Sequence, residues 1–170
     1  MRFFLAAAFA LAAASSLPAQ TPTPTAPPQT VTPPNGTAVA TPDLTYALPI
    51  AGNWTFAATP DGSAATFLSP AAMPQLAIRC SRATRRVSIS RAGTVAVPFL
   101  NLWTSTLTRS VPASFDPATA RITIQLAAND PLLDALAFTR GRFAVYVSGS
   151  PALVLPAWPE VIRVIEDCRS

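Results

Sequence analysis

Histidine and lysine are both absent from the 170-residue chain, and its twelve basic residues are all arginine. Without histidine there can be no Ser-His-Asp or Cys-His nucleophile, no imidazole general base and no histidine-containing zinc site. Without lysine there can be no Schiff base, no Ser-Lys dyad and no phosphate-binding loop ending in Gly-Lys-Ser/Thr. Most common hydrolase designs are therefore excluded.

Cysteine and glycine are also scarce. The two cysteines cannot form a four-cysteine metal site, and the six glycines include no GxGxxG motif. We therefore predict no metal ion and no cofactor. A carboxylate pair of the glycosidase type remains chemically possible, with Asp130 and Asp134 as the best-placed pair. Because the acidic residues of the folded region also fit turns, a helix cap and helix surfaces, we expect a protein that is not an enzyme.

Two stretches at the amino-terminal end differ from the rest of the chain. Residues 1–19 place Arg2 before an apolar run that is too short to span a membrane, followed by small residues, which is typical of a cleaved signal peptide. Residues 20–47 are rich in Pro and Thr and cannot bury enough apolar surface to become ordered, so we expect a linker. The remaining residues, 48–170, are predicted to form a single domain of an exported, periplasmic or secreted protein, with no membrane span in the mature chain.

Short runs of β-forming residues separated by turn residues predict a mainly β (α+β) domain, either a small antiparallel β-sandwich or a curved sheet. The runs are expected to pair as residues 53–58 with 63–68, residues 76–80 with 87–89, and residues 100–108 with 121–126, and residues 142–147 are expected to form a further strand. In the second pair, alternation directs Leu76, Ile78 and Cys80 to the buried face.

Two helices are predicted among these strands. Asp130 is a favoured helix N-cap before Pro131, so a short helix should run to about Phe138. A second helix should begin at Pro159 and carry Cys168 on its buried stripe. Because Cys80 also faces inward, the simplest pairing in an oxidising compartment is a Cys80–Cys168 disulfide. A redox role is the alternative, but the chain contains no CxxC pair.

An arginine cluster marks the predicted hairpin around residues 81–85. Its members are Arg79, Arg82, Arg85, Arg86 and Arg91. Guanidinium groups match phosphate and carboxylate groups in a two-pronged geometry, so the cluster suits an anionic wall component or an envelope protein. The alternative is a surface that only keeps the protein soluble. Nucleic acid is not an expected partner, because no aromatic residues that would stack on bases are interleaved with the arginines.

The three tryptophans, Trp54, Trp103 and Trp158, suggest a platform for carbohydrate. Each lies within or beside an apolar, periodic segment. Packing in the core is therefore the preferred interpretation.

Several short motifs, taken in order, resemble those of small exported proteins of proteobacteria. They are Gly52-Asn53-Trp54, Asp61-Gly62-Ser63, Leu76-Ala77-Ile78-Arg79-Cys80 and Val87-Ser88-Ile89, followed by the apolar helix with Cys168. The pattern is most similar to uncharacterised exported envelope proteins of alphaproteobacteria of the sphingomonad type, and more loosely to type VI secretion accessory and invasion-associated exported domains. The resemblance implies a disulfide-tied β domain.

Together these observations predict a monomeric binding or accessory protein of the cell envelope. One alternative is a periplasmic inhibitor of a lysozyme or protease that presents the turn at residues 81–85 or the loop at residues 93–97. A carboxylate-dependent hydrolase is the other alternative.

Overall fold

The computed structural model describes residues 44–170, so the predicted signal peptide and all but the last four residues of the predicted linker lie outside the described residues. The described residues form ten strands and two helices. In chain order these are β1 (Asn53–Thr59), β2 (Gly62–Leu68), β3 (Pro74–Ser81), β4 (Arg86–Ala92), β5 (Phe99–Trp103), β6 (Thr108–Pro112), β7 (Ser114–Asp116), β8 (Arg121–Ala127), α1 (Pro131–Ala137), β9 (Arg142–Tyr146), β10 (Leu153–Pro156) and α2 (Pro159–Asp167).

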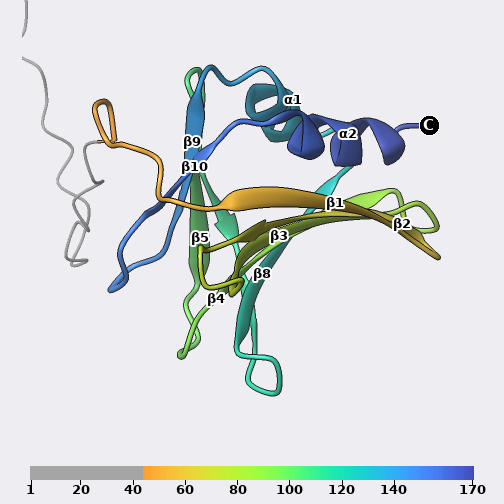
Figure 1. The fold of residues 1–170 in the computed structure, drawn as a ribbon. Helices are drawn as coiled ribbons and strands as arrows, with labels where there is room; N and C mark the ends of the chain where they lie inside the picture. Colours follow the sequence, from red (N-terminus) through yellow and green to blue (C-terminus); the bar gives the residue numbers. More distant parts are fainter. Residues whose placement is uncertain (1–43) are drawn as a thin grey trace, which may run out of the picture. The chain divides into compact units, whose positions relative to one another are not determined.

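The strands form two antiparallel sheets, which confirms the predicted fold class. The larger sheet has the order β1-β2-β3-β4-β8-β7, and the smaller has the order β10-β9-β5-β6. Figure 1 shows the smaller sheet standing at a steep angle to the larger one, with α1 and α2 on the same side of the larger sheet. The core fills the space that the two sheets and the helices enclose.

The apolar residues that alternate along β3 and β4 form the buried face of the larger sheet, as predicted. Leu76, Ile78, Val87 and Ile89 are fully buried, and Ile78 lies opposite Ile89. The β1–β2 hairpin is also confirmed, with Thr59 opposite Gly62 across a two-residue turn. Gly62 has φ +154°, and a Cβ atom there would lie 2.5 Å from the Cys80 carbonyl oxygen, so this approach of β2 to β3 requires glycine.

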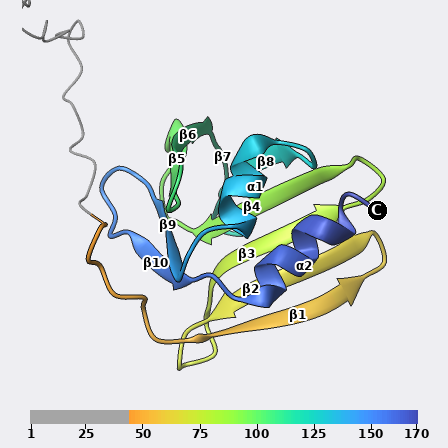
Figure 2. The same ribbon diagram turned by 90° about the horizontal axis from the view of Figure 1, so that it is seen from above.

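Both predicted helices are present. Asp130 caps α1 by accepting a hydrogen bond from the Leu132 backbone N–H at 2.8 Å. The second helix buries Val161, Val164 and Ile165 and packs mainly on β2 and β3. In Figure 2, α2 runs along the larger sheet beside β1.

The predicted pairing of residues 100–108 with 121–126 is wrong. The first segment contributes β5 and β6, which pair with each other in the smaller sheet, whereas β8 pairs with β4 and β7 in the larger sheet. The cause is a tight turn at Thr104, whose hydroxyl accepts a hydrogen bond from the Leu107 N–H at 2.9 Å and donates one to the Leu107 carbonyl at 2.8 Å. This turn folds the segment back on itself and closes a local hairpin.

The packed region also begins earlier than expected, within the predicted linker. Leu44 is 4% exposed and packs with Ala144, Tyr146 and Val154 in a second, smaller apolar cluster. This cluster covers the side of the smaller sheet that faces away from the main core. Residues 44–47 are therefore part of the domain.

Candidate functional site

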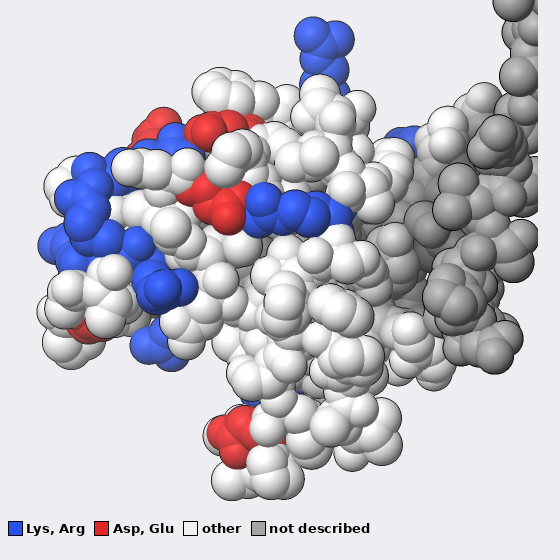
Figure 3. Space-filling model, turned by 180° about the vertical axis from the view of Figure 1, so that it is seen from behind, with Lys and Arg blue, Asp and Glu red and all other residues white. Residues whose placement is uncertain are grey.

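Four of the predicted arginines lie together at the end of the larger sheet where β3 turns into β4. Arg79 lies on β3, Arg86 on β4, and Arg82 and Arg85 in the turn, and all four are exposed. Arg79 is opposite Ser88 and Arg86 is opposite Ser81, so the two arginines are diagonal neighbours on the outer face of the sheet. Long side chains at such positions are within reach of each other. Figure 3 shows basic side chains gathered at one end of the molecule.

Three of these guanidinium groups lack an internal partner. The described residues contain two ion pairs, Arg109–Asp130 and Arg169–Asp134, each at 2.7 Å, and neither involves the hairpin. No hydrogen bond from the side chains of Arg79, Arg82 or Arg86 is present within residues 44–170. The Asp61 carboxylate lies at the same turn, where it accepts a hydrogen bond from the Ala83 N–H at 3.5 Å but forms no ion pair. The surface therefore keeps a net positive charge, which favours anions.

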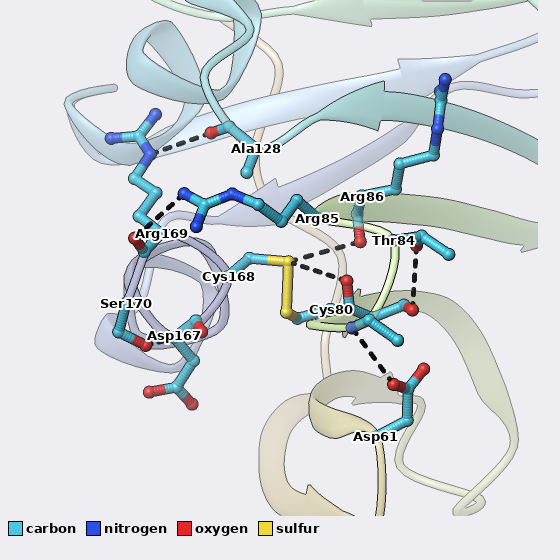
Figure 4. Close-up of a disulfide and its surroundings, with 12 residues drawn as sticks. Asp61, Cys80, Thr84, Arg85, Arg86, Ala128, Asp167, Cys168, Arg169 and Ser170 are labelled. Carbon is cyan, nitrogen blue, oxygen red and sulfur yellow. Dashed lines mark hydrogen bonds between the residues drawn. A yellow bond between two sulfur atoms is a disulfide. The ribbon is translucent and has the colours of Figure 1, made fainter.

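The fourth guanidinium is held by the carboxyl-terminal segment. Arg85 donates a hydrogen bond to the Arg169 carbonyl at 3.1 Å, and Arg169 itself donates to the Ala128 carbonyl at 2.9 Å. The Arg169 charge is paired with Asp134. Figure 4 shows Arg85 directed toward Arg169 while Arg86 points away from it. We define the arginine surface as Arg79, Arg82, Arg85 and Arg86.

The backbone of the turn is fixed by its neighbours. The Asp61 carbonyl accepts a hydrogen bond from the Arg82 N–H at 2.9 Å, and the Thr84 hydroxyl donates to Ser81 Oγ at 2.9 Å. Arg85 adopts a positive φ of 50°, closed by a hydrogen bond from its N–H to the Arg82 carbonyl at 3.2 Å. The arginines are thus presented on a defined backbone.

The predicted disulfide lies directly beneath this surface. Cys80 and Cys168 are bonded, with Cα atoms 5.3 Å apart, and both residues are buried. The bond ties the end of α2 to β3 one residue after Arg79 (Figure 4). Both cysteines are engaged in this bond, and the described residues contain no free cysteine.

Arg91 does not belong to the arginine surface, contrary to the prediction. It is 7% exposed, and its guanidinium donates to the Val145 carbonyl at 3.2 Å and the Pro151 carbonyl at 3.4 Å. Burial lowers the pKa of this guanidinium. Arg91 therefore links the larger sheet to β9 of the smaller one. The sequence already indicated this orientation, because Val87, Ile89 and Arg91 are two residues apart in turn and therefore lie on the same face of the strand.

Asp130 and Asp134, the pair that could serve a carboxylate-dependent hydrolase, each form an ion pair with an arginine. Asp130 caps α1 and is paired with Arg109, and Asp134 is paired with Arg169. Across residues 44–170 there is no group of three or more Cys, Asp or Glu side chains that could hold a metal ion.

The tryptophans divide between core and surface. Trp54 is 5% exposed, packs against the rings of Phe67 and Phe143, and donates its indole N–H to the Pro156 carbonyl at 2.9 Å. Trp103 is half-buried against the Leu44 cluster. The core interpretation is wrong for Trp158, which is 37% exposed where the chain enters α2.

The second loop considered for an inhibitor also lies at the surface. In the Gly93–Val97 loop, Val95 is 62% exposed. The amide of Gly93 anchors the loop by donating to the Ala120 carbonyl at 3.0 Å.

No protein-family model, curated protein or solved structure matches the chain. The assignment of a function therefore depends on the geometry described above. None of the helices within residues 44–170 has the length and apolar character needed to cross a membrane.

Proposed function

We propose that the protein is a non-catalytic binding or accessory protein of the bacterial cell envelope that engages an anionic polymer through the arginine surface. The observation that carries the proposal is the set of three exposed guanidinium groups, on Arg79, Arg82 and Arg86, without an ion pair or side-chain hydrogen bond in the described residues. Export is supported by the buried disulfide, since such bonds form and persist in oxidising compartments.

The chemistry of the arginine surface favours phosphate or carboxylate groups repeated along a chain. A guanidinium donates two parallel hydrogen bonds to either anion, and several of them on one rigid hairpin bind a polymer more tightly than a single anion. Exposed ion pairs each contribute about 0.5 kcal/mol, so the three unpaired arginines together should account for about tenfold in affinity.

The test replaces Arg79, Arg82 and Arg86 together with serine and measures binding to isolated bacterial cell envelope, to polyphosphate and to polygalacturonate. We expect about tenfold weaker binding to the envelope and to at least one of the two polymers, and weaker binding of the original protein as salt is raised. Arg140→Ser is the matched control, because Arg140 is also exposed but lies outside the hairpin. Unchanged envelope binding by the triple variant would refute the proposal.

A second variant separates charge from geometry. Lysine at all three positions keeps the positive charge but removes the two-pronged donor. If guanidinium geometry contributes to recognition, the lysine variant should bind with an affinity between those of the serine variant and the original protein.

A further inference from the structure

The outer edge of β1 is the least protected strand edge in the described structure. The four strands at sheet ends are β1, β7, β10 and β6. Strand β7 spans only three residues, and β10 and β6 each end in proline. Strand β1 has seven residues, NWTFAAT, with neither a charge nor a proline. Proteins usually protect such an edge, because its unpaired N–H and C=O groups accept another strand.

The hydrogen-bond pattern identifies which groups of β1 face outward. The Asp61 carbonyl accepts a hydrogen bond from the Arg82 N–H. In an antiparallel sheet the backbone groups of successive residues point to opposite neighbours, so every second residue from Asp61 onward is hydrogen-bonded to β3. The residues of β2 between them are hydrogen-bonded to β1. The partners of these intervening residues are Asn53, Thr55, Ala57 and Thr59. The backbone groups of Trp54, Phe56 and Ala58 therefore point away from the sheet.

A cleft lies on the helix side of this edge. It has a volume of about 430 Å³ and is lined by Phe56 on β1 and by Pro159, Glu160, Ile162, Arg163 and Glu166 on α2. Figure 2 shows α2 running along the sheet inside β1, with β1 at the outer margin of the described structure. Every second side chain of a strand added to β1 would point toward α2 and enter this cleft.

The charges in the cleft favour a basic side chain. Arg163 lies over the Phe56 ring, with its guanidinium carbon 3.9 Å from the ring centroid. Glu160 and Glu166 lie three residues to either side of it. The Oε2 atom of Glu160 is out of contact with solvent and accepts no hydrogen bond. Glu160 is half-buried, and neither it nor Glu166 takes part in an ion pair within residues 44–170, so an incoming ammonium or guanidinium group that reaches the accessible part of the Glu160 carboxylate would be stabilised there.

The same charges disfavour a second copy of the chain as the occupant. Antiparallel pairing of two β1 strands about Phe56 would place each Arg163, which lies over Phe56, facing its own copy. Glu160 would then face Glu166 of the other copy. In this register the facing charges on the two helices would be alike, at a cost in free energy.

We propose that the β1 edge and this cleft bind an extended peptide segment of a partner protein, which adds to β1 as a strand and directs a lysine or arginine side chain at Glu160. The main-chain hydrogen bonds supply affinity, and the alternate side chains supply specificity. This site lies at an edge strand of the larger sheet, apart from the arginine surface at the β3–β4 turn, and takes a ligand of opposite charge.

The test uses two fluorescein-labelled peptides, Thr-Lys-Thr-Val-Thr-Val-Thr and the same sequence with Glu in place of Lys, and measures their fluorescence polarisation on the purified chain. We expect the lysine peptide to bind at least tenfold more tightly than the glutamate peptide. Glu160→Gln should remove most of this preference, whereas Asp167→Asn, on the same helix but outside the cleft, should retain it.

A backbone variant tests strand addition itself. Ala58→Pro removes one outward N–H without touching the bonds between β1 and β2, and proline is tolerated at such an edge position. It should weaken the lysine peptide about tenfold, since one hydrogen bond is lost and its acceptor is left unpaired.

Three results would overturn the proposal. They are the absence of saturable binding by either peptide, equal affinity for both, and concentration-dependent dimers in sedimentation experiments that Ala58→Pro dissociates. The Glu160→Gln comparison keeps the proposal open to refutation even if circular dichroism shows that the proline variant is misfolded.

Discussion

The disulfide between Cys80 and Cys168 closes a loop with a sequence separation of 88 residues. Replacing both cysteines with alanine frees the unfolded chain from this constraint. In the chain-entropy treatment, a loop of this length corresponds to a loss of about 4.6 kcal/mol in the free energy of unfolding. For a domain of this size, such a loss lowers the melting temperature by about 15 to 20 °C.

The same change should leave the fold in place. Helix α2 buries Val161, Val164 and Ile165, and each such side chain contributes about 1.5 to 3 kcal/mol through burial. The helix therefore remains packed on β2 and β3 without the disulfide. Only the segment after Asp167 loses its covalent tie in the folded state, so increased local opening should be confined to its amides. Amides that exchange only through global unfolding should all exchange faster, in line with the loss of stability.

Urea unfolding followed by tryptophan fluorescence tests this account, because Trp54 is buried and becomes exposed on unfolding. We expect the urea concentration at the unfolding midpoint to fall. The free energy of unfolding should also depend more steeply on urea, since an uncrosslinked unfolded chain exposes more surface. The original protein measured under reducing conditions is the matched control and should behave like the variant. A loss below about 1.5 kcal/mol with an unchanged urea dependence would refute the loop-entropy reasoning.

Three further predictions concern residues outside the two proposed sites. Arg91→Met should lower the free energy of unfolding by about 3 kcal/mol in urea titrations, because buried carbonyl groups lose their donor. The Asp116 carboxylate accepts hydrogen bonds from the Thr119 hydroxyl, which has the larger effect, and from the Ala118 backbone N–H, and both lower its pKa below the ordinary value. The resulting stabilisation is present above the ordinary carboxyl pKa and is lost as pH falls through the lowered one. Thr119→Val should therefore raise the Asp116 pKa in an NMR titration. Gly62→Ala should cost at least about 3 kcal/mol by the same urea assay, whereas Gly149→Ala, where a Cβ atom meets nothing within 4 Å, should cost only about 1 kcal/mol for its positive φ.

The disulfide and the carboxyl-terminal helix could be predicted from the sequence because both depend on local periodicity, and α1 could be predicted from its N-cap at Asp130 and the proline that follows it. Cys80 lies on the same face of its strand as Leu76 and Ile78, and Cys168 lies at helical spacing from Val161 and Ile165. Both sulfur atoms are therefore expected to face the core. The structure confirms the pairing. The partner of a strand is a different matter, because alternation identifies the face that a strand buries but not its neighbour in the sheet.

The places of Arg91 and Leu44 depend on contacts between distant segments. A charged residue indicates an exposed position, but backbone carbonyls at the junction of the two sheets accept hydrogen bonds from the buried Arg91. Pro/Thr-rich neighbours indicate a linker at Leu44, but its side chain packs in the cluster around Tyr146. In both cases a tertiary contact, which composition does not encode, decided the outcome.

The two proposed surfaces should respond differently to loss of the disulfide, because the segment after α2 contacts one of them and α2 itself lines the other. Arg85 is held by the Arg169 carbonyl, which follows Cys168 directly, so freeing Cys168 releases this arginine from its contact. The cleft beside Phe56 is lined by residues between Pro159 and Glu166, which precede Cys168 and lie next to side chains that hold α2 on the sheet. Removing the disulfide should therefore change binding at the arginine surface while the affinity for the lysine peptide stays within about twofold, provided that the protein remains folded. A parallel loss at both surfaces would mean that α2 depends on the disulfide for its packing, contrary to the burial of its apolar side chains.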